Sequence, residues 1–149
     1  MGLDMYLQRK IYIQSWSDAY QVSVTFNGNP TTIQSQRVTY VVEEIGYWRK
    51  ANAIHKWFVD NVQKGKDDCG EYYVSSEDLK KLHDICLQVL ENPKDGNHLL
   101  PTVNGFFFGS TEYDDYYLDD VRHTVEVCAE ALKLLEIDKR CSFYYSSSW

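Results

Sequence analysis

Two segments of the chain hold residues whose types and spacing suit the binding of a small charged ligand, and the first is Glu43–Val59. If this segment is a helix, a rotation of about 100° per residue places Trp48, Asn52 and His55 in a band roughly 80° wide. Arg49 lies at the edge of that band. Arginine binds phosphate, an aromatic ring stacks and an amide reads base edges, which favours a planar anion such as a nucleotide. The alternative is a buried network in which Asn52 and His55 bond to the backbone.

The second segment follows three adjacent phenylalanines and begins at Gly109. Ser110 and Thr111 stand at a predicted helix start, where free backbone N–H groups form an anion site. The acidic residues that come next would satisfy the helix dipole and repel phosphate, so an ordinary acid-rich helix start is the alternative. The predicted ligand-binding residues from both segments are Trp48, Arg49, Asn52, His55, Phe107, Ser110, Thr111 and Tyr113.

Catalytic and metal-binding motifs are not recognisable in the sequence. The string GFFFGSTEY lacks the GxSxG pattern of a nucleophile elbow, and neither HExxH, a Walker loop nor GxGxxG occurs. Acidic residues at helical spacing near the second segment (Asp114, Asp115, Asp119 and Asp120) offer metal ligands, but such faces are usually solvated. We therefore predict no catalytic residue, no metal and no cofactor. One enzymatic alternative remains open, in which His55 acts as a base beside an acid from residues 113–120.

The composition describes one globular domain covering residues 1–149. Hydrophobic residues make up 44% and charged residues 25%, and aromatic residues, at 15%, suit binding pockets and interfaces as well as cores. The net charge of −7 is opposite to that of a general nucleic-acid binder, so we expect no direct nucleic-acid contact. Cys69, Cys86, Cys128 and Cys141 contain no CxxC pair for zinc. No secretory signal or membrane span is apparent, which predicts a cytoplasmic protein.

The elements that must position these residues begin with strands. Alternating side chains predict strands at residues 5–13 and 20–26, and β-branched residues predict a third at 31–42. A turn signal at 27–30 joins the last two. These strands suggest an antiparallel meander, which a helix over residues 43–63 then follows.

Two further helices and a last strand complete the prediction. Ser75 or Ser76 caps a helix that stops at Asn92 before a proline. Another helix starts near Thr111, which is spaced from Asp114 like a capping box, and runs to about residue 136. Residues 141–145 are predicted to be a strand. The fold class is therefore α+β: an antiparallel sheet of N-terminal strands plus a C-terminal strand, packed against three helices.

Long strings in the chain resemble a family of small proteins encoded by bacteriophages and prophages. These strings are MGLDMYL at the start, EIGYWRKANAIHKWF at 44–58, GFFFGST at 105–111 and the aromatic C-terminal end. The family is uncharacterised and supplies no catalytic residues. The resemblance implies a context, because small accessory phage proteins often act against host defence or host metabolism.

Three functional hypotheses follow. The first is a non-enzymatic binding protein of phage origin that counters host defence by sequestering a small nucleotide-like signal in the host cytoplasm. The second is an inhibitor that uses an acidic, tyrosine-rich surface against a host defence nuclease or DNA-binding protein. The third is a nucleotide-processing enzyme with His55 as its base. The sequence leaves the oligomeric state open.

Overall fold

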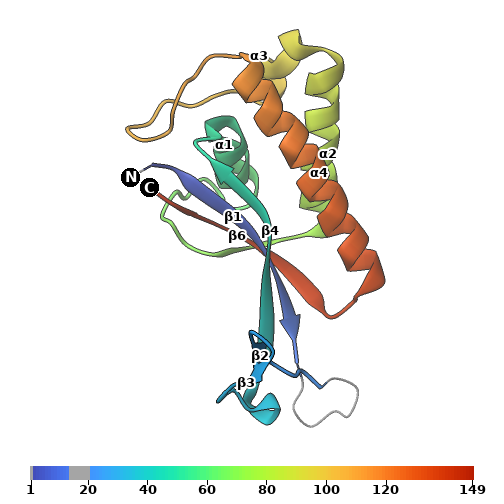
Figure 1. The fold of residues 1–149 in the computed structure, drawn as a ribbon. Helices are drawn as coiled ribbons and strands as arrows, with labels where there is room; N and C mark the ends of the chain where they lie inside the picture. The colour runs from blue at the N-terminus through green and yellow to red at the C-terminus, as the bar shows by residue number, and fades with distance from the viewer. Residues whose placement is uncertain (1, 14–20) are drawn as a thin grey trace.

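The computed structural model describes residues 2–13 and 21–149, and its architecture is α+β, as predicted. Figure 1 shows a curved antiparallel sheet with helices beside it. The order of strands in the sheet is β4-β1-β6-β5, with β1 and β6 in the centre. The strands of this sheet are β1 (Asp4–Tyr12), β4 (Tyr40–Arg49), β5 (Tyr72–Val74) and β6 (Cys141–Ser148). The helices are α1 (Asn52–Asn61), α2 (Ser76–Glu91), the single turn α3 (Gly96–Leu99) and α4 (Asp115–Ile137).

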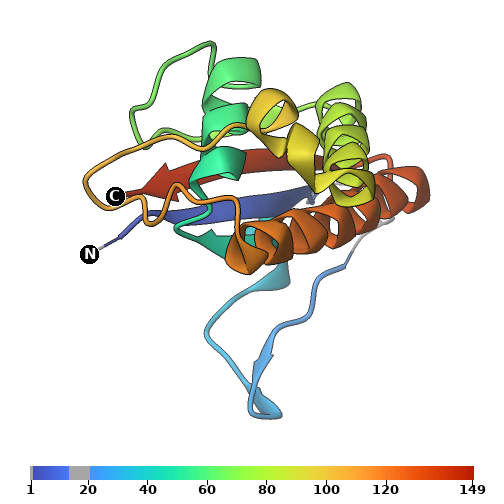
Figure 2. The same cartoon turned by 90° about the horizontal axis from the view of Figure 1, so that it is seen from above.

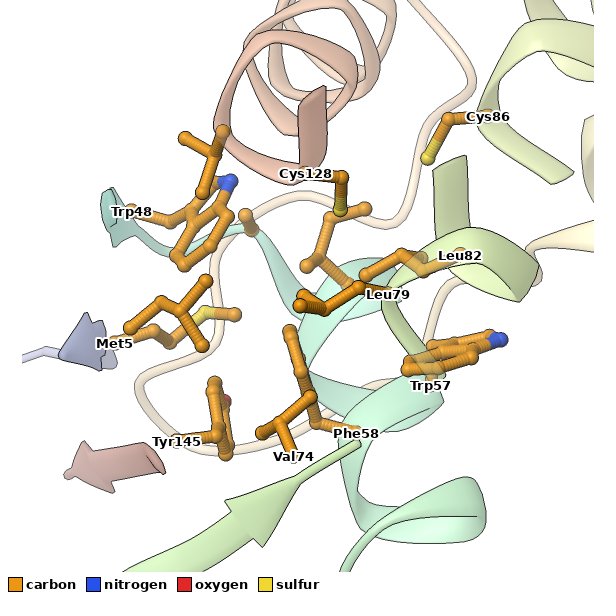
Figure 3. Packing of buried hydrophobic residues seen from close by; sticks show 14 of the residues in the cluster. Met5, Trp48, Trp57, Phe58, Val74, Leu79, Leu82, Cys86, Cys128 and Tyr145 are labelled. Atoms are coloured by element: carbon orange, nitrogen blue, oxygen red, sulfur yellow. The ribbon is translucent and has the colours of Figure 1, made fainter. Parts of the chain in front are cut away.

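Helices α1 to α4 cover one face of the sheet, as the view in Figure 2 shows. Alternation along the central strands explains this, because every second side chain of a strand points to the same face. Met5 and Leu7 of β1 and Phe143 and Tyr145 of β6 are fully buried under the helices. Figure 3 shows Met5 and Tyr145 in one cluster with Leu79 and Leu82 of α2, and Cys86 and Cys128 belong to the same apolar cluster. The C-terminal strand is therefore part of the core.

The two long helices begin at side-chain caps. Ser75 Oγ accepts a hydrogen bond from the Asp78 N–H at 3.1 Å, and the Asp78 carboxylate bonds back to the Ser75 N–H, which makes a capping box. The predicted Thr111–Asp114 box at α4 is wrong. Asp114 is itself the N-cap, since its Oδ1 accepts from the Tyr117 N–H at 3.0 Å, and α4 starts four residues later than predicted.

The predicted helix over residues 43–63 is wrong in its first half. Residues up to Arg49 belong to β4, which pairs with β1 along its whole length, and the helix begins only at Asn52. Strand pairing overrides the local helical period here. At Gly46 the backbone of β4 packs closely against α4. A Cβ added there would lie 2.5 Å from Cγ1 of Val127, so this position needs glycine.

The predicted N-terminal meander is also wrong. β2 (Thr25–Phe26) and β3 (Asn29–Pro30) form a separate two-stranded hairpin that projects from the body below β4 in Figure 1. The predicted turn between them is confirmed, with positive φ angles at Asn27 and Gly28. Residues 31–39 contain a short 3-10 turn instead of a strand, and the start of the predicted 20–26 strand, Tyr20, lies outside the described residues.

Candidate functional site

A cleft of about 350 Å³ opens where the end of β4, the start of α1 and the first turns of α4 converge. This volume is within the range of small-ligand sites. Three of the predicted ligand-binding residues line it: Arg49, Asn52 and Ser110. The cleft is therefore the place in the fold at which both predicted segments meet.

One wall of the cleft carries positive charge. Arg49 ends β4 and Lys50 follows it; both are exposed and line the cleft together with Ala53 and Ile54 of the first turn of α1. The N-cap position of α1, Ala51, supplies no side-chain hydrogen bond, and the first turn of the helix contains no acidic residue. The positive end of the α1 dipole thus adds to the two cations.

The opposite wall is acidic and belongs to α4 and the residues just before it. Glu112, Asp114, Asp119 and Asp120 line it, beside the ring of Tyr116. Burial raises the pKa of the Asp120 carboxyl to about 6, with Asp119 and Asp114 adding to the rise and His123 opposing it. A carboxylate held in this costly state is typical of functional sites as well as of ion-pair networks.

Asn52 fixes the floor of the cleft and has no free hydrogen-bonding group. Its Nδ2 donates to the carbonyl oxygens of Phe108 at 3.0 Å and Ser110 at 2.8 Å. Its Oδ1 accepts from the Val103 N–H at 3.0 Å. Asn52 therefore holds the 103–110 loop against α1. Its amide is occupied by these bonds, so it is not available for the role that the sequence predicted, bonding the edge of a base.

His55 lies outside the cleft, in a buried cluster of its own. Its Nδ1 is 2.7 Å from the Tyr145 hydroxyl oxygen and its Nε2 is 3.0 Å from Asp67 Oδ2. Burial raises the pKa of the Tyr145 hydroxyl well above its usual value and so keeps it protonated. In the imidazole tautomer with its proton on Nε2, Nε2 donates to the Asp67 carboxylate and Nδ1 accepts from the Tyr145 hydroxyl. The edge of the imidazole also packs on the Phe108 ring. We call these four residues the His55 cluster.

The remaining predicted residues also lie away from the cleft. Trp48 is buried in the core, as Figure 3 shows, and its Nε1 donates to Thr124 Oγ1 at 2.9 Å. Phe107 packs edge-on against Phe106, and Thr111 is exposed. The Tyr113 hydroxyl accepts from the Thr102 N–H at 3.1 Å and so holds the loop instead of facing the cleft.

None of the acidic-wall residues was among the predicted ligand contacts, and two of them, Tyr116 and Asp120, share a helical spacing. Tyr116 and Asp120 are one turn apart on α4, so they share a face of that helix. The signal that identifies them is this i, i+4 spacing of a tyrosine and an acid.

Comparison with known proteins adds no relative. No family model matches the chain, and neither a curated protein nor a solved structure matches it. Within residues 2–13 and 21–149, no group of three or more His, Cys, Asp or Glu side chains is arranged to hold a metal ion. In the same part of the chain no helix has the length and apolarity needed to cross a membrane.

Proposed function

We propose that the protein is a non-enzymatic binding protein that holds a small nucleotide-like ligand in the cleft. The observation that carries the proposal is the pair of oppositely charged walls, with Arg49 and Lys50 on one side and the α4 acids on the other. Such walls fit a ligand with an anionic end and a hydrogen-bond-donating end. A nucleotide has both, in its phosphate and its base.

The aromatic residue of the cleft supports a ligand with a flat ring. Tyr116 lines the cleft and is 81% exposed, so its ring face is available for stacking. Stacking of a base on an aromatic side chain contributes about 1–3 kcal/mol in nucleic-acid complexes. Phosphate contacts from Arg49 and Lys50 add charge-assisted hydrogen bonds at the other end.

The arrangement of His55 favours binding over catalysis. Its side chain is 1% exposed and both ring nitrogens already have partners. A general base must come within hydrogen-bond distance of the proton it removes. His55 does not line the cleft, so it is not placed to act as a base on a nucleotide bound there. This disfavours the enzymatic alternative.

Sequestration of a host signalling nucleotide in the host cytoplasm is the role we propose for this binding. The resemblance to small phage-encoded proteins supports a role against host defence. A protein that removes a signal without turnover needs a binding site and stoichiometric expression, and it needs no catalytic group.

Calorimetric titration with a panel of linear and cyclic nucleotides tests the proposal. We expect 1:1 binding to at least one member, weakened about tenfold or more by Arg49→Glu because charge reversal repels the phosphate. Lys64→Glu, a reversal on the loop after α1, is the matched control and should leave the affinity unchanged. A folded sample that gives no heat with any nucleotide contradicts the proposal.

A second candidate function, inhibition of a basic host protein, is favoured by one specific observation. The surface around the start of α4 exposes Tyr113 and Tyr116 beside the acids Glu112, Asp115 and Asp119. Tyrosine is enriched in protein interfaces, and acidic groups complement a basic nuclease or DNA-binding protein.

Capture from host lysate tests this second candidate. We expect one stoichiometric basic protein, released at high salt. The double variant Glu112→Lys/Asp115→Lys should abolish capture, and it leaves the Asp114 cap of α4 intact. Undiminished capture by this variant would exclude the surface.

A further inference from the structure

We propose that the cleft selects guanine nucleotides over adenine nucleotides, because Asp120 accepts hydrogen bonds from two adjacent N–H groups of the base. This inference rests on the proposed function and specifies its ligand. It also assigns orientation: the phosphate end faces Arg49 and Lys50, and the base lies along α4.

Asp120 is a half-buried acceptor of the acidic wall. Asp114 Oδ1 accepts from the N–H of Tyr117, and Asp119 is paired with Arg122. Among the residues that the structure describes, the half-buried Asp120 carboxylate makes no hydrogen bond or ion pair with the protein. An acceptor that is partly withdrawn from water and has no protein partner gains from a ligand that supplies donors.

The surroundings of Asp120 compensate its charge only in part. Burial is the main cause of its raised pKa, Asp119 and Asp114 repel it, and His123, one turn along α4, opposes the rise. A ligand that brings the positive end of its own dipoles to this carboxylate would stabilise its charged form.

Guanine meets this requirement better than adenine does. A carboxylate has two oxygens that accept in parallel, and guanine offers its N1–H and its amino group side by side. Adenine offers one amino N–H next to the ring nitrogen N1, a lone pair that would face a carboxylate oxygen. Sites built to bond paired donors reject analogues that lack one, because a buried acceptor is left unpaired.

The position of Tyr116 agrees with this orientation. It precedes Asp120 by one helical turn, so both side chains project from the same face of α4 into the cleft. A base bonded at its edge by Asp120 can lie with its face on the Tyr116 ring.

Titration of guanosine and adenosine monophosphates against wild type, Asp120→Asn and Asp115→Asn tests the inference. We expect wild type to bind the guanine nucleotide about tenfold or more tightly than the adenine nucleotide, in line with a charged hydrogen-bonded pair. Asp120→Asn should lose this preference. Asp115→Asn, a matched change at an exposed position of the first turn of α4, should keep it.

A pH series on wild type provides a second measurement that needs no variant. Affinity for the guanine nucleotide should be greatest above pH 6 and fall as Asp120 protonates, whereas affinity for the adenine nucleotide should change less.

The outcomes separate the inference from the proposed function. Equal affinity for both bases, or a preference that Asp120→Asn retains, overturns the guanine inference and leaves nucleotide binding standing. The absence of binding to any nucleotide overturns both. Binding of free arginine in place of nucleotides would also overturn it, because a guanidinium presents the same paired donors without a phosphate.

Discussion

The His55 cluster and the cleft share helix α1 but treat their polar groups in opposite ways. In the His55 cluster both imidazole nitrogens have partners, and the ring is buried. In the cleft, the N-terminus of α1 has no side-chain cap, and the half-buried Asp120 also lines the cleft without a protein partner for its carboxylate. Satisfied polar groups stabilise a fold, whereas unsatisfied groups at a cavity leave binding energy for a ligand.

The difference shows why a polar residue among apolar ones is not enough to locate a site. Asn52 and His55 are three positions apart on α1, and both hold the 103–110 loop, one through backbone carbonyls and the other through the Phe108 ring. What separates structure from function is whether the hydrogen-bonding capacity of each group is already used.

The largest loss of stability is expected from His55→Ala, which removes the central residue of the His55 cluster. The change leaves the Tyr145 hydroxyl and the Asp67 carboxylate without their partner and opens a void beside Phe108. We expect a loss of about 3 kcal/mol in the free energy of unfolding, measured by urea denaturation. His98→Ala, at an exposed position, should change stability by less than about 0.5 kcal/mol. A His55 variant as stable as wild type would refute the structural role.

Asn52→Ala is expected to have the next largest effect. It removes the contacts to Val103, Phe108 and Ser110, so stability should fall by about 2 kcal/mol. Amide hydrogen exchange should quicken across residues 103–110, because this loop forms part of the cleft. Asn97→Ala, an exposed amide, is the control. Unchanged exchange in the loop would show that other contacts hold it.

The sequence predicted the fold class and most element ends where the signal is local. The helix cap predicted at Ser75 or Ser76, the turn at Asn27 and Gly28 and the last strand depend on neighbouring residues, and each is confirmed. The error at 43–51 arose because helical spacing of apolar residues also fits a strand that is buried at one end only. Pairing with β1, more than 30 positions away, decides that case, and local periodicity does not contain this information.

The candidate site was predicted in part for the same reason. Arg49, Asn52 and Ser110 reach the cleft because two segments far apart in sequence meet there. Trp48 does not, since in a strand it points to the opposite side from its neighbour Arg49, into the core. Whether Asn52 and His55 have free hydrogen-bonding groups depends on loop carbonyls, Asp67 and Tyr145, and the sequence cannot supply those distances.

Asp120→Asn should stabilise the protein at neutral pH. The folded-state pKa of about 6 exceeds the ordinary value of 3.8. The free energy of unfolding therefore falls as pH rises between these two values and the carboxyl becomes charged in the folded protein. Allowing for solvent screening, we expect a gain of about 1 kcal/mol at pH 7.5 and none near pH 4. Thermal melts of both proteins at the two pH values measure it. Equal stability at pH 7.5 would mean that the carboxylate is solvated and has no binding energy to offer.

The smallest effect is expected from replacing two lysines that lie in the left-handed region of backbone space. These are Lys50 in the cleft (φ 59°) and Lys64 in the loop after α1 (φ 56°). Glycine is more stable than lysine in this conformation, so Lys50→Gly and Lys64→Gly should each raise the free energy of unfolding by about 0.5 kcal/mol. Only Lys50→Gly should weaken nucleotide binding, since only Lys50 lines the cleft. If both variants bind like wild type, the strain at Lys50 serves the turn from β4 into α1 and has no part in ligand binding.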